Sequence, residues 1–143
     1  MSAHCQVDFY VLTSPRRTAD LLACKLALMA WERGHSVVVV TPDDNRAKAL
    51  DELMWEHPRG RFLPHGRGGA GAATGAPVTI VTRPPHSDSD VVINLTGSAL
   101  EGPLPFRRVL EIVPHDPAER ASSREKFRHY RSLGLRPNKH EIN

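Results

Sequence analysis

Apolar residues recur along the chain in short uninterrupted runs of the kind that form buried strands. The clearest run is Val37 to Val40, four β-branched residues in succession, which is typical of a central parallel strand buried on both faces. Similar runs are bounded by proline, glycine or polar residues, which stop strands. We therefore predict strands at residues 7–12, 36–41, 78–82, 91–95 and 108–113.

Between these runs the apolar positions change to the three- and four-residue spacing of helices. The pattern predicts helices at residues 18–33, 45–55 and 117–133. The first of them is apolar on nearly every side, which predicts a helix that neighbouring structure covers all round. Gly34 and Gly134 follow the first and the last helix, where a residue in the left-handed conformation commonly ends a helix.

Strands that alternate with helices need crossover connections, and crossovers join parallel strands. The chain is therefore predicted to be an α/β protein, a Rossmann-like three-layer sandwich with a mainly parallel sheet. Its 143 residues predict a single domain over residues 1–143. Residues 66–75 hold five of the ten glycines and are predicted to be a flexible surface loop, and the short polar tail after residue 134 is predicted to fray.

Charge and composition exclude several classes of protein. The formal net charge is only +3 and 24% of the residues are charged, so the chain is not a histone-like polycation. Its eight histidines are scattered, and Cys5 and Cys24 form no CxxC motif, so we expect no metal site and two free thiols of a reducing compartment. We find no secretory segment and no apolar run approaching the ~20 residues of a membrane helix, and we expect a soluble cytoplasmic protein.

A nucleotide-dependent enzyme or a direct nucleic-acid binder is the alternative that this fold class invites. However, the first strand-to-helix turn, residues 13–17, contains no glycine, and the chain has no Walker element. Gly66 to Gly71 matches GxGxxG by letter, but it follows no long strand and opens no predicted helix. We therefore predict no phosphate-binding loop and no cofactor. The chain also has no Gly-x-Ser-x-Gly elbow of a nucleophilic serine, and we predict no catalytic residue.

A basic stripe lies on the last predicted helix. Arg120, Arg124, Arg128 and Arg131 recur there at helical spacing, with Phe127 among them. At ~100° per residue, the four arginines fall within roughly a quarter of the helix circumference. Because arginine pairs bidentately with carboxylates, the stripe suits an acidic peptide ending in an aromatic residue at least as well as a nucleic acid backbone. The simpler alternative is a solvated helix face.

A second candidate surface combines aromatic residues and proline between the second helix and the glycine-rich segment. It contains Phe62 and Pro64, with Trp55 before them in the chain. Aromatic anchors of this kind bind protein partners, whereas the simpler alternative is closure of the core.

The order and spacing of several motifs resemble the chi subunit of the bacterial DNA polymerase III holoenzyme. The motifs are FYVL at 9–12, WERG at 31–34, ALDELMW at 49–55, FLPH at 62–65, APV at 76–78, VINL at 92–95, FRRVLEIV at 106–113 and the helix over 124–134. The resemblance implies a non-catalytic accessory protein of the clamp-loader assembly in DNA replication, with polymerase activity in other subunits. It implies neither sequence-specific DNA binding nor membrane binding.

The resemblance also implies two protein-binding surfaces. One would capture the acidic C-terminal tail of single-stranded DNA-binding protein in a small pocket flanked by basic side chains. The matching positions are Val113, Arg120, Arg124, Phe127, Arg128 and Arg131. The other would hold the psi subunit or a helicase-like protein at Phe62 and Pro64, with Trp55 as a neighbour. On this basis Arg124→Ala or Arg128→Ala is expected to weaken tail binding by roughly 1–3 kcal/mol.

Overall fold

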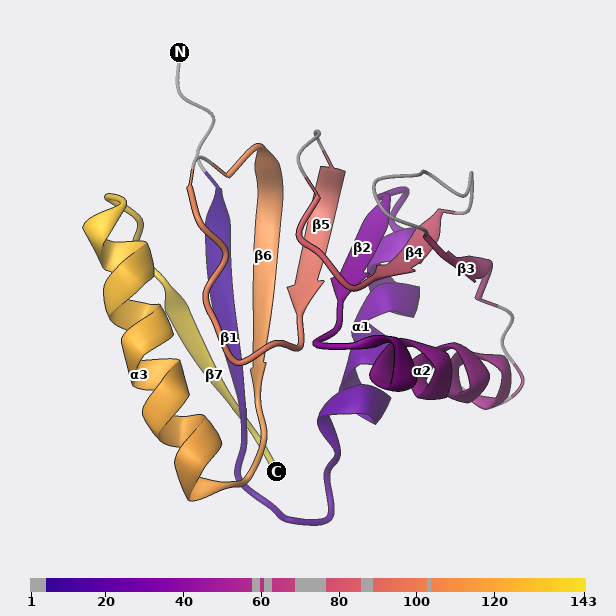
Figure 1. Ribbon diagram of the computed structural model, residues 1–143, viewed down its shortest axis with the longest axis horizontal. Helices are drawn as coiled ribbons and strands as arrows, with labels where there is room; N and C mark the ends of the chain where they lie inside the picture. The colour runs from indigo at the N-terminus through magenta and orange to yellow at the C-terminus, as the bar shows by residue number, and fades with distance from the viewer. Residues whose placement is uncertain (1–4, 58–59, 61–62, 69–76, 86–88, 103) are drawn as a thin grey trace.

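The computed structural model describes residues 5–57, 60, 63–68, 77–85, 89–102 and 104–143. Strands and helices alternate along most of the chain (Figure 1). The strands are β1 (Gln6–Leu12), β2 (Val37–Val40), β3 (His65–Arg67), β4 (Val78–Val81), β5 (Ser89–Asn94), β6 (Phe106–Val113) and β7 (Asn138–Ile142). The helices are α1 (Ala19–Glu32), α2 (Asp44–Glu56) and α3 (Pro117–Ser132).

The seven described strands form one sheet in which every described pair is parallel. Their order across the sheet is β3-β4-β2-β5-β6-β1-β7. The valine strand β2 lies between β4 and β5, with Val39 in register with Ile80 on one side and Ile93 on the other. These pairings confirm the prediction of an α/β protein with a parallel sheet.

The three helices begin beyond the carboxyl ends of strands, each at a side chain that caps it. Thr18, Asp43 and Asp116 are the N-cap residues of α1, α2 and α3, and each side-chain oxygen accepts a backbone N–H from the first turn. These caps satisfy donors that have no partner within the helix. The helix starts therefore gather at the edge of the sheet where the parallel strands end.

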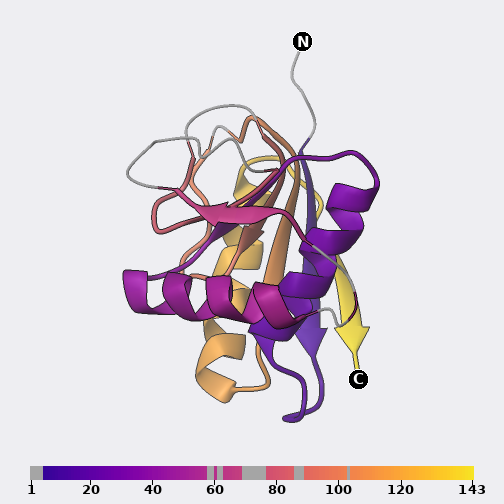
Figure 2. The ribbon, with the colours of Figure 1, turned by 90° about the vertical axis from the view of Figure 1, so that its right-hand side faces the viewer.

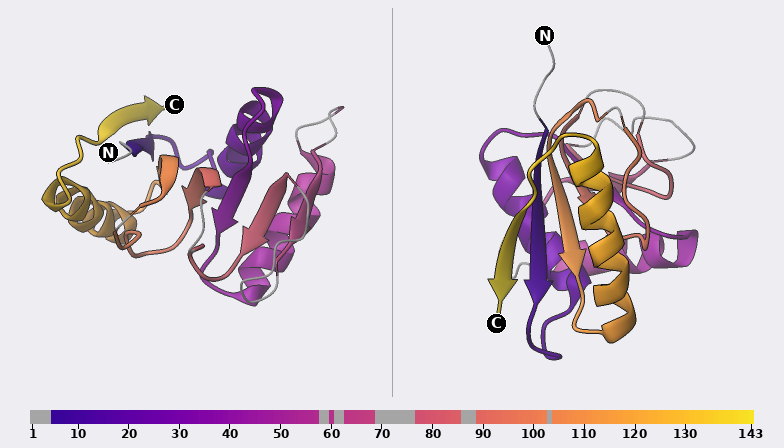
Figure 3. Two further views of the ribbon diagram at one scale, coloured as in Figure 1. Left: turned by 90° about the horizontal axis from the view of Figure 1, so that it is seen from above. Right: turned by 90° about the vertical axis from the view of Figure 1, so that its left-hand side faces the viewer.

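Different helices cover the two faces of the sheet (Figures 2 and 3). The face under α1 and α2 carries Val39 and Ile80 in one apolar core. The face under α3 carries Val40 and Phe9, which pack with Tyr130 of α3 in the other core. Successive residues of a strand point to opposite faces, so one β-branched run supplies both cores. The result is the predicted three-layer sandwich.

The tail after residue 134 corrects one expectation, because it forms a strand instead of fraying. Residues 138–142 form β7, which pairs with β1 from Asp8 to Leu12. The backbone N–H and the hydroxyl of Thr13 donate hydrogen bonds to the carbonyl of Ile142 at 2.9 and 3.1 Å. The prediction was wrong because strand formation here depends on pairing with β1, which a polar local sequence does not reveal.

Part of the predicted loop 66–75 also belongs to the sheet. Gly66 and Arg67 lie in the edge strand β3, and the N–H of Gly68 donates to the carbonyl of Ile80 at 2.8 Å. The prediction of a loop is therefore wrong for Gly66 and Arg67, while 69–76 lie outside the described residues.

A membrane-spanning helix is not found in the described part of the chain, since none of its helices has the necessary length and apolarity.

Candidate functional site

The predicted basic stripe lies on α3, the helix that covers one face of the sheet alone. The side chain of Arg120 is half-buried, whereas Arg124, Arg128 and Arg131 are exposed to solvent. Asp116 caps the helix, with its Oδ1 accepting from the backbone N–H of Ala118 at 2.8 Å. The Asp116 carboxylate therefore already occupies the N-terminus of α3, where an anion would otherwise bind. The positive charge of this surface comes from the arginine side chains.

A hollow of about 300 Å³ opens at the start of α3. It is lined by His115, Asp116, Pro117, Arg120 and Arg124. Within the described residues, neither of its two arginines has an acidic side chain within 4 Å. Guanidinium groups without a carboxylate partner are available to an anionic ligand.

Two of the predicted site residues belong to the apolar core between α3 and the sheet and do not line the hollow. Val113 is buried at the end of β6. The ring of Phe127 is half-buried, and its centroid lies 5.5 Å from that of Phe9 in the core under α3. Both residues belong to the apolar core under α3, the helix that carries the basic stripe.

The other two predicted arginines lie further along α3. Arg128 forms an ion pair with Glu125 on the exposed surface of the helix. Arg131 is exposed in the last turn of α3 and does not line the hollow. The structure therefore brings Arg120 and Arg124 together at one opening and leaves Arg128 and Arg131 on the adjoining surface.

Sequence reasoning missed that His115 and Pro117 line the hollow. His115 lies in the turn from β6 into α3, and Pro117 is the first residue of α3. The sequence predicted this segment only as the start of the last helix. The signal that could have found them is their position. Residues that follow a parallel strand and precede a helix N-terminus lie at the edge of the sheet where ligands commonly bind.

A buried polar network fixes α3 to the sheet. The Glu111 carboxylate of β6 accepts hydrogen bonds from Lys126 at 2.8 Å, from Tyr130 at 2.6 Å and from Asn94 at 2.8 Å. The side chains of Glu111 and Lys126 are 0% and 6% exposed. Tyr130 also accepts from the backbone N–H of Leu100 at 3.0 Å.

Burial raises the pKa of Glu111 above its ordinary value, and the Lys126 ammonium opposes that rise. The network joins α3, β6 and the segment after β5, so it sets the rotation of α3 about its axis. That rotation directs Lys126 inward and the arginine stripe outward.

The second predicted surface lies at the end of α2. Trp55 is 63% exposed, and its ring centroid lies 4.8 Å from that of His65. The buried His65 ring is fixed by an Nε2 contact of 3.1 Å to the Asp51 carboxylate. Pro64 is half-buried beside it in the chain, and Phe62 lies outside the described residues. An exposed aromatic ring on a fixed base is thus present near the predicted position.

The described residues give little support to enzyme chemistry. They include no cluster of three or more histidine, cysteine, aspartate or glutamate side chains that could hold a metal ion. Burial raises the pKa of Cys5 to about 11 and that of Cys24 to about 12, so both are protonated thiols and poor nucleophiles at neutral pH. Gly66 and Arg67 belong to the edge strand β3, and the next element that the structure describes is the strand β4, whereas a phosphate-binding loop leads into a helix.

Comparisons with known proteins agree with one another. A family model described as "DNA polymerase III chi subunit, HolC" matches residues 5–138. The chain is 38% identical over 142 residues to the DNA polymerase III subunit chi of Pseudomonas aeruginosa, covering 96% of each chain. It is 33% identical over 137 residues to that of Escherichia coli, covering 91% of this chain and 93% of the relative.

A more distant likeness concerns the fold alone. A chain in the solved complex of S. cerevisiae dbp5 with nup159, gle1, ip6 and adp superposes with a TM-score of 0.60 at 10% sequence identity. The likeness covers 97% of this chain and 42% of that one. At such low identity it supports only the α/β architecture.

The family model spans nearly all of the chain, and the two bacterial relatives match it almost from end to end. The chain therefore belongs to the family of DNA polymerase III chi subunits, accessory subunits in DNA replication.

Proposed function

We propose that the protein is a non-catalytic adaptor in the clamp-loader assembly of DNA polymerase III. It captures the acidic C-terminal tail of single-stranded DNA-binding protein on α3. At the end of α2 it holds the psi subunit or a helicase-like protein. By binding both, it tethers the polymerase to coated single strands in the cytoplasm, while polymerase activity resides in other subunits.

The observation that carries this proposal is the hollow at the start of α3. Arg120 and Arg124 line it without an acidic partner among the described residues. Two guanidinium groups at one opening suit a ligand with several carboxylates, because each forms charge-assisted hydrogen bonds. The tail's acidic residues and terminal carboxylate have this chemistry.

The remaining proposed contacts extend the site along the helix. Phe127 offers a half-buried aromatic ring to the tail's terminal aromatic residue, and the buried Val113 belongs to the same apolar cluster. Arg128 and Arg131 supply further positive charge on the same stripe. A flexible tail loses conformational entropy when it docks, so we expect micromolar affinity that weakens as salt screens these contacts.

Arg124 and Arg128, for which the sequence predicted the same loss, are expected from the structure to contribute unequally, because Arg128 is already paired with Glu125. Arg124→Ala should weaken binding of a synthetic tail peptide by about 1–3 kcal/mol, because it removes charge-assisted hydrogen bonds in the hollow. Arg128→Ala should cost less than about 1 kcal/mol, since that side chain is highly exposed and already paired with Glu125. Titration calorimetry measures both affinities.

The matched control is Arg107→Ala, which removes an exposed arginine from the start of β6, away from the hollow. It lowers the net charge by the same amount as Arg124→Ala and should leave the affinity for the peptide unchanged. Equal affinities for wild type, the Arg124 variant and the control would reject the proposed site.

A pull-down separates tail recognition from direct nucleic-acid binding. Intact single-stranded DNA-binding protein should retain the chain, whereas a form lacking its last residues should not. Retention by bare single-stranded DNA, with a steep salt dependence from several phosphate contacts, would favour the nucleic-acid binder instead. Retention of the truncated protein at the level of the intact one would also contradict the adaptor.

For the second surface, the proposed contacts are Trp55, Pro64 and Phe62. The exposed indole of Trp55 supports this proposal, because large aromatic side chains commonly supply the binding energy at protein interfaces.

A further inference from the structure

The outward face of α1 is apolar although no described element covers it. Leu21 is 40% exposed and Met29 is 39% exposed, and Leu22 between them is half-buried. The sequence predicted that neighbouring structure covers this helix all round, whereas the described residues cover only its inner side. A helix that is apolar on every side is normally buried, so within the described part of the chain the outward face lacks a partner.

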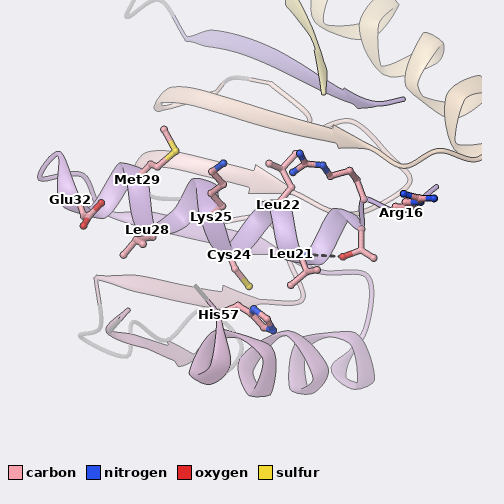
Figure 4. Close-up of a pocket in the computed structure, with 11 residues that line it drawn as sticks. Arg16, Leu21, Leu22, Cys24, Lys25, Leu28, Met29, Glu32 and His57 are labelled. Carbon is pink, nitrogen blue, oxygen red and sulfur yellow. Dashed lines mark hydrogen bonds between the residues drawn. The ribbon is translucent and has the colours of Figure 1, made fainter. Parts of the chain in front are cut away.

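This face is also hollowed. A groove of about 480 Å³ runs along α1 and reaches His57, the residue that follows α2. In Figure 4, Leu21, Cys24 and Leu28 point to the side of α1 where His57 lies, and Met29 points to the other side. Apolar side chains thus form the walls over almost the full length of the helix.

Positive charge flanks the groove. Arg16 and Arg17 lie at its start, and Lys25 lies halfway along α1 and points away from the side where His57 lies (Figure 4). All three side chains are exposed. Within the described residues, none of them has an acidic side chain within 4 Å. Glu32 is the single acidic residue among those that line the groove. The groove therefore complements a ligand that is apolar on one side and negatively charged at its flanks.

A second copy of this chain fits the groove poorly. Lys25 lies midway between Leu21 and Met29, so two copies paired about a two-fold axis at this point would bring their Lys25 ammonium groups together. Like charges opposed in an interface are unfavourable. The flanking charges instead favour a partner of opposite sign.

We propose that the outward face of α1 is a docking site for an amphipathic helix of another protein, with acidic side chains flanking its apolar stripe. The 14 residues of α1 span about 21 Å at ~1.5 Å per residue, so a partner helix of about four turns covers the groove. Ridges of its apolar side chains pack between those of Leu21, Leu22 and Met29. Arg17 and Lys25 then face its carboxylates.

This site is independent of the proposed tail site. The two lie on opposite faces of the sheet, one on α1 and the other on α3, as Figure 3 shows. One chain can therefore bind both ligands at the same time.

The test uses the full chain and a fluorescent synthetic peptide of about 15 residues, which suffices to span the groove as a helix. The peptide carries leucine at helical i, i+3, i+4 and i+7 spacing with glutamate at the flanking positions. A second peptide has lysine in place of every glutamate. We expect the acidic peptide to bind at least about tenfold more tightly in fluorescence anisotropy, because its charge complements Arg17 and Lys25.

Variants then locate the binding. The double variant Leu21→Gln/Met29→Gln should weaken the acidic peptide at least about tenfold, and Lys25→Glu at least about threefold. The matched control is Leu133→Gln, which changes a similarly exposed apolar residue after α3 and should leave the affinity within about twofold. A thermal melt of each variant verifies that it is folded.

Several results would overturn the proposal. These are equal binding of the two peptides, no binding of the acidic peptide, or affinities that the α1 substitutions leave unchanged. Concentration-dependent dimers in sedimentation that Met29→Gln abolishes would assign the face to a second copy. Binding to vesicles of anionic phospholipid, but not to the acidic peptide, would assign it to a membrane surface.

Discussion

Lys126→Met is expected to lower the free energy of unfolding by about 3–5 kcal/mol, the range for removing one partner of a buried ion pair. The ammonium group of Lys126 donates to the Glu111 carboxylate at 2.8 Å, and the glutamate has no exposed surface. Without the lysine, the buried carboxylate keeps only its neutral donors, Tyr130 and Asn94. Methionine fills the space of the lysine stem, so the loss measures the charge more than the packing.

The size of this loss depends on pH in a defined direction. Burial raises the pKa of Glu111, and Lys126 opposes the rise, so removing the lysine raises that pKa further. A carboxyl group whose folded pKa exceeds its unfolded value stabilises the fold fully below the unfolded pKa of ~4.3. That stabilisation disappears as the pH rises through the folded pKa. The variant should therefore lose more stability at neutral pH than at mildly acidic pH.

Urea denaturation of the wild type and the variant at two pH values measures these quantities. The control is the double variant Glu111→Gln/Lys126→Met, which removes both charges and should recover part of the loss. A loss below about 1 kcal/mol, or one that does not change with pH, would contradict the view that the pair bears a buried charge.

The network also explains why the orientation of the basic stripe could be predicted only in part. The helical spacing of Arg120 and Arg124 was enough to place them on one side of α3. Helical spacing also separates Lys126 from them, but nothing in the local sequence says that its ammonium group is buried. Its partner Glu111 is 15 residues earlier in the chain, and such contacts are set by the packing of whole elements.

Most of the fold followed from local patterns. The uninterrupted valines of β2 predicted a central strand because such a run is apolar on both faces of a sheet. Capping residues such as Thr18 and Asp43 precede helices for a local reason, the unsatisfied N–H groups of the first turn. The predicted bounds of these elements agree with the structure to within a few residues.

The edge strands β3 and β7 could not be predicted in the same way. β7 has the sequence NKHEI and is mostly exposed, so it lacks the apolar alternation of a half-buried strand. Charged residues on an edge strand discourage unwanted pairing with other chains, which is why such a strand can look like a polar tail. Its strand conformation comes from pairing with β1.

Deleting residues 138–143, which also removes the pairing of β7 with β1, is expected to lower the free energy of unfolding by about 3 kcal/mol, mainly through the loss of two side-chain contacts. The first is the hydrogen bond at 2.9 Å between the His140 ring and the buried Asp8 carboxylate; bonds to charged groups contribute about 1.5–3 kcal/mol. The second is the half-buried side chain of Ile142, which packs against the core under α1 and contributes about 1 kcal/mol.

The electrostatics of Asp8 make the His140 contact the larger of the two. Burial opposes ionisation of Asp8, yet the hydrogen bonds from His140 and Arg108 hold the pKa of this carboxyl below its ordinary value. Without β7 the buried carboxylate keeps Arg108, at 2.6 Å, and Gln6, at 3.0 Å. The truncated chain should therefore still fold, but with lower stability.

Single substitutions divide the effect of the deletion between these contacts. His140→Ala should reproduce about half of the loss, whereas Lys139→Ala on the exposed side of the same strand should change the stability by less than about 0.5 kcal/mol. Urea denaturation measures all three variants against the wild type. Unchanged stability of the truncated chain would instead support the sequence-based prediction of a frayed tail, because removing a segment that makes no lasting contacts does not change the free energy of unfolding.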